Sequence, residues 1–182
     1  MTLPSKPGPA ASIESALRQI DDWIGPDGVA GAGAAVWRQG ELVAERYAGE
    51  GQPGVPVDES TIFALASVTK PVAAAVLLCL VDDGLLGLDE PAGRFLPEFL
   101  DADDAGEYGQ FRTEVTVRHL LCHTSGLPED LTAQQIPMSA KPTLDDMIDA
   151  MCRLPLLEEP GTELRYSNPG YGMLARIVHR IS

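Results

Sequence analysis

A serine and a lysine three residues apart stand at the start of an apolar stretch. Ser67 and Lys70 are followed by Pro71 and a run of small and aliphatic residues that reaches Val81. Because side chains at positions i and i+3 share one face of a helix, the Lys70 amine can lie over the Ser67 hydroxyl. If Ser67 opens the helix, the positive end of the helix dipole also stabilises an oxyanion that develops there. Pro71 fits this placement, since the first turn of a helix tolerates proline.

This pair of residue types is suited to acyl transfer. A serine hydroxyl becomes a good nucleophile when a neighbouring base removes its proton. A lysine amine normally stays protonated at pH 7, so the base role requires a pocket or a neighbouring cation that favours the neutral amine. The spacing taken alone has a second interpretation, in which Ser67 is only a helix cap and Lys70 only a solvated cation.

Two elements precede this pair. Ser12 is expected to cap a helix that carries apolar residues at a 3.6-residue period and stops at Gly25-Pro26. Residues 31–38 and 41–48 then read as two strands joined by a two-residue hairpin turn at Gln39-Gly40. The stretch from Gly49 to Ser60 reads as a loop.

Short helices dominate the rest of the chain. The helix after Ser67 is expected to end at Asp82-Asp83-Gly84, and Pro and Gly then punctuate short helical pieces. A short helix is predicted over residues 116–122, and a second one opens at a capping box that begins with Thr143 and ends before Pro155. The last segment, from Tyr171 on, has apolar residues at helical spacing.

Three further patterns are poor indicators of function. Residues 49–54 match GxGxxG, but an embedded proline and the lack of a following helix pattern argue against dinucleotide binding. The acidic loop from Asp101 begins like a calcium loop, yet Arg112 stands where a bidentate Glu is required. His123 and Ser125 lie two residues apart on a turn, which is poor geometry for a base and a nucleophile, so a structural role for His123 is favoured.

Composition narrows the class of protein. The 182 residues carry a formal net charge of −14, which argues against nucleic acid and anionic membranes as partners. The longest apolar run, Val72 to Val81, is too short to span a bilayer, and the N-terminus lacks the apolar segment of a signal peptide. The three cysteines form no CxxC pair and are expected to be reduced, mostly buried thiols of a cytoplasmic protein.

Three motifs occur in one order along the chain: Ser67-Val68-Thr69-Lys70, the run from His123 to Pro128, and Tyr166-Ser167-Asn168. In this order and at these separations they resemble the serine β-lactamase and penicillin-binding-protein-like hydrolases. The most similar branch contains class C β-lactamases, DD-peptidases and related carboxylesterases. The resemblance covers the chain from about residue 30 to its end, and it favours the catalytic interpretation of Ser67 and Lys70.

The resemblance implies a fold and a set of roles. Ser67 would be the acylated nucleophile, Lys70 its proton partner, Tyr166 the second member of the acid/base pair, and Asn168 a residue that orients substrate or water. The implied fold is α/β (α+β), an antiparallel sheet flanked by helices with an inserted all-helical subdomain. We therefore expect an N-terminal part over 1–83, a helical subdomain over 84–165, and the Tyr-Ser-Asn motif with the start of a return helix over 166–182. No metal and no cofactor is expected.

One feature of the family is absent. A Lys or His followed by a small residue and Gly should lie on a strand beyond Tyr166, but the sixteen residues that follow read as helix. Loss of one oxyanion-hole donor alone costs about 2.7–4 kcal/mol in other hydrolases, and two strands alone are marginal in water. These 182 residues are therefore expected to be the N-terminal part of a longer hydrolase, which a complementing C-terminal chain or segment would complete.

The predicted function is a serine hydrolase that forms an acyl-enzyme at Ser67 with ester, amide or β-lactam carbonyls, most simply a cytoplasmic esterase on small acyl substrates. The alternative is a catalytically silent binding or assembly module that keeps the fold for packing alone.

Overall fold

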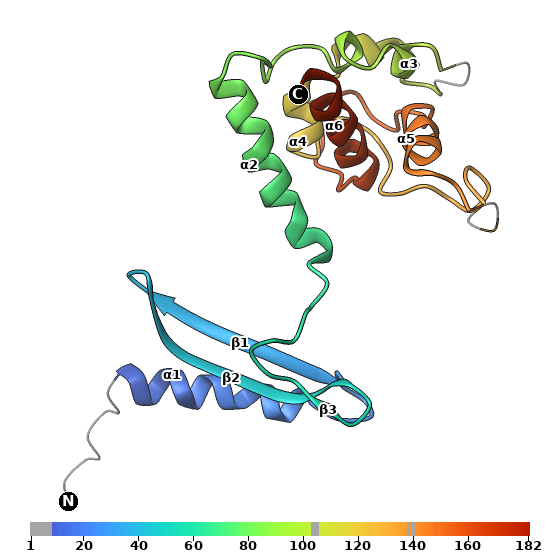
Figure 1. Cartoon of the computed structure of the whole chain (residues 1–182). Coiled ribbons are helices and arrows are strands. Elements are labelled where there is room, and N and C mark those ends of the chain that lie inside the picture. Colours follow the sequence, from blue (N-terminus) through green and yellow to red (C-terminus); the bar gives the residue numbers. More distant parts are fainter. Residues whose placement is uncertain (1–8, 103–105, 138, 140) are drawn as a thin grey trace, which may run out of the picture. The chain divides into compact units, whose positions relative to one another are not determined.

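The structure is a computed structural model, and it describes residues 9–102, 106–137, 139 and 141–182. The chain divides into two compact units, one ending at Ala64 and the other spanning Leu65–Ser182. Figure 1 shows a sheet with a helix in the first unit and a group of helices in the second. The three parts expected from the sequence, over residues 1–83, 84–165 and 166–182, stay a prediction.

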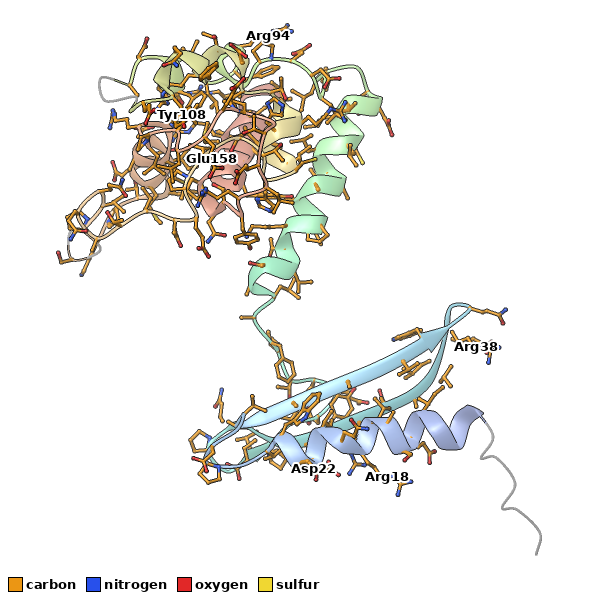
Figure 2. All side chains as sticks on the ribbon, turned by 180° about the vertical axis from the view of Figure 1, so that it is seen from behind. Arg18, Asp22, Arg38, Arg94, Tyr108 and Glu158 are labelled. Carbon is orange, nitrogen blue, oxygen red and sulfur yellow. The ribbon has the colours of Figure 1, made fainter. Side chains whose placement is uncertain are left out.

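The first unit begins with helix α1 (Pro9–Leu17), which continues as a 3-10 segment, η1 (Arg18–Trp23). The expectation that Ser12 caps this helix is wrong, because the helix already begins at Pro9, whose fixed φ suits a first helical position. Figure 2 shows Arg18 and Asp22 on this helical segment and Arg38 near the hairpin end of the sheet.

An antiparallel sheet of order β1-β2-β3 completes the first unit; its strands are β1 (Gly31–Arg38), β2 (Glu41–Gln52) and β3 (Val55–Pro56). The predicted hairpin is confirmed. Gln39 and Gly40 both have positive φ, 55° and 84°, as a two-residue type I′ turn requires.

The predicted loop from Gly49 to Ser60 is partly wrong, because β2 runs on to Gln52 and β3 pairs with it. Glycine makes this continuation possible. Gly49 adopts a φ of 74°, and a Cβ there would lie 2.2 Å from the Ala30 carbonyl oxygen. Because glycine has a low strand propensity, the sequence pattern did not predict this pairing. The GxGxxG match therefore lies in a strand and its turn, not between a strand and a helix.

The second unit opens with one 3-10 turn, η2 (Ala66–Val68), that leads directly into helix α2 (Thr69–Asp82). The predicted end of this helix is confirmed. The Gly84 N–H donates to the Val81 carbonyl and the Leu85 N–H to the Leu80 carbonyl, both at 3.0 Å, with Gly84 at a φ of 72°. This is a Schellman motif, which needs a residue that tolerates positive φ.

Short helices follow, as predicted, with gaps of irregular chain between them. They are η3 (Ala92–Arg94), α3 (Pro97–Leu100), η4 (Gly109–Glu114), α4 (Val117–Leu121), α5 (Leu144–Cys152) and α6 (Asn168–Ile181). Thr116 and Thr143 each form a complete capping box at the start of α4 and α5. Helix α6 packs against α4 and α5 (Figure 1).

One core holds this unit together. It joins α2, the short helices and α6, and its largest fully buried side chains include Phe99, Leu77, Leu96, Leu120, Leu127, Leu154, Leu156, Met173 and Ile177. Arg112, the residue that argued against a calcium loop, is buried in it. Its guanidinium donates to the backbone carbonyls of Phe99, Cys152 and Leu154, and so satisfies the ends of α3 and α5.

The expected apolar face of α6 is only partly buried. Of the apolar residues at helical spacing, Leu174 is buried, and Tyr171 and Val178 pack against the core while staying partly exposed. Met173 and Ile177, on an adjacent face, are fully buried. The predicted face lines a groove together with Ala73, Val76 and Leu77 of α2. Helix α6 is thus apolar over a wider arc than a single-sided surface helix needs.

Two of the three cysteines are exposed, which corrects the expectation of mostly buried thiols. Cys79 lies on α2 and Cys122 at the end of α4, both exposed, while Cys152 is buried and none forms a disulfide. Burial raises the pKa of the Cys152 thiol to about 12. Among the helices of the described residues, none is long and apolar enough to cross a membrane.

Candidate active site

Ser67 lies in the 3-10 turn that feeds α2, and Lys70 lies one helical turn further on. The Lys70 Nζ donates to the Ser67 Oγ at 3.2 Å, as the spacing of the two residues predicts. Ala66, immediately before the serine, has a φ of 45°. A non-glycine residue in the left-handed region stores backbone strain, and such strain tends to occur at functional sites. Ser67 is exposed, so a substrate can reach its hydroxyl.

Tyr166 comes from a distant part of the chain and lies directly on Ser67. The Tyr166 Oη and the Ser67 Oγ are 2.5 Å apart, and either oxygen can be the donor. The Lys70 Nζ also lies over the Tyr166 ring, 4.8 Å from its centre. The three groups that the sequence motifs singled out therefore form one cluster within the second unit.

Asn168 completes the set. Its side-chain Oδ1 accepts a hydrogen bond from the Lys70 Nζ at 2.8 Å. The other side of the amide is held by Asp130, whose Oδ2 accepts from the Asn168 Nδ2 at 3.3 Å. Ser167, which stands between Tyr166 and Asn168 in the sequence, caps α6, since its Oγ accepts from the Gly170 N–H at 3.2 Å. Tyr166 and Asn168 thus flank a helix start, which fixes both relative to Lys70.

The electrostatics of the cluster favour the phenolate form of Tyr166. Its hydrogen bond with Lys70, and next the one with Ser67, lower the pKa of the Tyr166 hydroxyl from its ordinary value. Burial, which acts in the opposite direction, is outweighed because the phenol is partly open to solvent, with 37% of the residue exposed. A phenol with a lowered pKa is a stronger candidate for a general base near neutral pH.

The contacts of His123 fit the structural role that the sequence analysis favoured. Its Nδ1 accepts a hydrogen bond from the Ser167 N–H at 3.1 Å. Ser125 is buried, and its Oγ accepts from the Leu127 N–H at 3.4 Å. His123 and Ser125 thus bond to different backbone N–H groups and not to each other. The sequence analysis did not predict that His123 packs on Tyr166 or that Asp130 binds Asn168. The motif from His123 to Pro128 was the feature of the sequence that could have drawn attention to this segment.

All four predicted site residues are therefore brought together: Ser67, Lys70, Tyr166 and Asn168. Hydrogen bonds link the nucleophilic hydroxyl to the phenol, the amine to the hydroxyl, and the amine to the amide. Such a set can take a proton from a hydroxyl and return it to a leaving group. Among the described residues, no group of three or more His, Cys, Asp and Glu side chains is placed to hold a metal ion.

The chain is similar in sequence to two longer bacterial proteins. The chain is 34% identical over 170 residues to protein Rv1367c of Mycobacterium tuberculosis, covering 84% of this chain and 42% of that protein. It is 42% identical over 121 residues to esterase EstB of Burkholderia gladioli, covering 65% of this chain and 30% of EstB. The chain therefore spans less than half the length of these relatives.

A solved structure shows the same fold. The D-amino acid amidase from Ochrobactrum anthropi SV3, complexed with L-phenylalanine amide, superposes with a TM-score of 0.71 at 31% identity. The match covers 92% of this chain and 45% of the amidase. This confirms the predicted α/β (α+β) class, which combines helices with an antiparallel sheet.

The model of the family described as "Beta-lactamase" matches residues 14–182, nearly the whole chain. This chain belongs to the β-lactamase family of serine hydrolases.

Proposed function

We propose that this chain carries the nucleophile and the acid/base pair of an acyl-transferring serine hydrolase. The observation that supports this most directly is the position of the Ser67 Oγ, 2.5 Å from the Tyr166 Oη and 3.2 Å from the Lys70 Nζ. A nucleophile and a base within hydrogen-bond reach, with a third group that orients the base, is the arrangement expected of covalent catalysis.

In the proposed reaction, the Tyr166 phenolate takes the proton of Ser67 while the Ser67 Oγ attacks the substrate carbonyl carbon. The bond from this carbon to the leaving oxygen or nitrogen breaks, and Tyr166 passes the proton to the leaving group. Lys70, as an ammonium, stabilises the phenolate before the transfer and acts as proton partner of the pair. In the second step the phenolate takes a proton from a water molecule, whose oxygen attacks the acyl carbon. The bond from this carbon to the Ser67 Oγ then breaks, the carboxylic acid leaves, and Tyr166 returns the proton to the Oγ.

Asn168 would hold Lys70 in place and present its amide to substrate or water. Its Oδ1 accepts from Lys70, so the amide nitrogen points the other way, toward Asp130.

The proposed substrates are small carboxylic acid derivatives, with esters favoured over amides and β-lactams. The esterase name of one relative and the amidase name of the solved structure support this class, since both act on acyl carbonyls through a leaving alcohol or amine.

The test is covalent labelling of Ser67. The purified chain is treated with a fluorophosphonate or with penicillin, and its intact mass is measured together with that of the Ser67→Ala variant. We expect one adduct on the wild-type chain and none on the variant. An unmodified wild-type mass would favour the catalytically silent module instead. Rates with nitrocefin and with a p-nitrophenyl acyl ester then separate lactamase from esterase.

We also propose that full turnover requires polypeptide beyond these 182 residues, in the form of a complementing segment or chain. The chain matches 45% of the amidase, and its three-stranded sheet has only one central strand. Open strand edges and a short sheet are poor platforms for an oxyanion hole. Turnover of an ester by the purified chain at rates typical of esterases would rule this requirement out.

A further inference from the structure

His123 is bonded to the residues on both sides of Tyr166. Its carbonyl oxygen accepts from the Arg165 N–H at 2.8 Å, and its Nδ1 accepts from the Ser167 N–H at 3.1 Å. The backbone on either side of the catalytic phenol is therefore tied to one residue, although the two segments lie over 40 residues apart in sequence.

The imidazole ring also packs on the phenol itself. The centres of the His123 and Tyr166 rings are 4.6 Å apart, with 31° between the ring planes. On another side the His123 ring lies 5.2 Å from the Tyr171 ring of α6. Aromatic pairs at such distances favour defined offset geometries, so His123 restricts the orientation of the Tyr166 ring as well as its backbone.

These contacts require a particular form of His123. An Nδ1 that accepts a hydrogen bond from an N–H carries no proton, so the ring is the neutral tautomer with its proton on Nε2. Burial, and next the charge of Lys70, lower the pKa of His123 and so favour this neutral form. The titratable groups around the ring are Lys70 from α2, Tyr166 from the loop before α6, and Tyr171 from α6.

The backbone of His123 adds a constraint of its own. Its φ is 60°, in the left-handed region that most side chains avoid. A residue with a side chain is kept here at a conformational cost, although glycine would fit without one.

We infer that His123 is a positioning residue for Tyr166: its unprotonated Nδ1 and its ring hold the phenol at hydrogen-bond distance from Ser67 and Lys70. This inference rests on the proposed function, because positioning matters for chemistry only if Tyr166 is the base. His123 itself forms no hydrogen bond with Ser67. It acts through the Tyr166 backbone and ring.

Two variants test the hydrogen-bond acceptor of residue 123 while both allow its backbone conformation. Asn and Gly both tolerate positive φ, and Asn places an oxygen acceptor near the position of Nδ1 whereas Gly has none. His123→Asn therefore keeps the hydrogen bond to Ser167, and His123→Gly loses it while relieving the strain. The Tyr166 pKa is measured in both by NMR of ¹³Cζ-labelled tyrosine, and Tyr166→Phe identifies its signal among the four tyrosines.

We expect His123→Gly to raise the Tyr166 pKa toward its ordinary value and to slow fluorophosphonate labelling of Ser67 by about 10- to 100-fold. His123→Asn keeps the acceptor but loses the ring, so it should keep part of the lowered Tyr166 pKa and label at a rate between those of wild type and His123→Gly, within about tenfold of wild type. A merely structural role would lower the thermal stability of a variant without moving the Tyr166 pKa.

Three results would overturn the inference. These are a His123→Gly variant with wild-type Tyr166 pKa and labelling, a His123→Asn variant as impaired as the Gly variant, and a wild-type ¹⁵N spectrum in which the Nδ1 of His123 is protonated near pH 7. The last measurement needs no variant, so a Gly variant that fails to fold does not block the decision. Absence of label on the wild-type chain would count against the proposed function alone, since the tyrosine and histidine signals still report on positioning.

Discussion

Replacing Tyr166 by phenylalanine removes a single oxygen from the proposed site. That oxygen lies 2.5 Å from the Ser67 Oγ, while the ring that remains keeps its packing against His123 at 4.6 Å. A positioned acid or base contributes roughly 100- to 10,000-fold to such reactions. Ser67 keeps Lys70 as a second partner at 3.2 Å, so we expect the lower end, a fall of about 100-fold in the rate of Ser67 labelling.

The assay is the pseudo-first-order rate of fluorophosphonate labelling, followed by intact mass at a series of pH values. The wild-type rate should rise with pH as the phenol ionises and level off above its pKa. Because Lys70 lowers that pKa, the rise should occur below the pH expected of an ordinary tyrosine. Lys70→Met removes the cation, so its rise should shift to higher pH and its rate at pH 7 should fall.

Tyr171→Phe is the matched control. The Tyr171 ring also lies beside His123, at 5.2 Å, but its hydroxyl donates to the Leu121 carbonyl at 3.2 Å and not to Ser67. This variant should label at close to the wild-type rate, and both variants should keep nearly the wild-type unfolding midpoint. A Tyr166→Phe variant that labels as fast as wild type, or a Tyr171→Phe variant that loses as much, would refute Tyr166 as the base.

Other parts of the molecule give three more tests. Arg112→Met leaves three buried backbone carbonyls without a charged donor, and should lower the free energy of unfolding in urea by about 3–5 kcal/mol. Two thiols should react with DTNB at once in the folded chain, while Cys152 should react only on unfolding, since it is buried and its pKa is about 12. Asp130→Ala frees the Asn168 amide to rotate and should slow Ser67 labelling by about two- to fivefold, because the lost bond is exposed; an unchanged rate would show that Lys70 alone orients the amide.

Features of the fold that depend on neighbours in sequence were predictable. The hairpin at Gln39-Gly40, the end of α2 at Gly84 and the capping box of Thr143 each follow from the conformational preferences of a few adjacent residues. The contact between Ser67 and Lys70 belongs here too, because helix geometry alone brings positions three apart together.

Other features depended on packing between distant segments. The sequence pattern missed the continuation of β2 past Gly49, since the pairing arises from close approach of two backbones and not from strand propensity. The expectation for Cys79 was also wrong, because residue type says which side chains can be buried but not which neighbour covers them.

The sequence by itself determined which residue types were available for chemistry and, by likeness of motifs, that Tyr166 and Asn168 belong with Ser67. Only the tertiary structure decided that the Tyr166 hydroxyl meets a serine 99 residues away, and that His123 holds the backbone on both sides of it. The physical reason is the separation along the chain over which each effect acts. Turn and helix geometry act over a few residues, whereas the pKa of a phenol and the aim of a hydroxyl are set by whatever groups the packed core brings within a few ångströms.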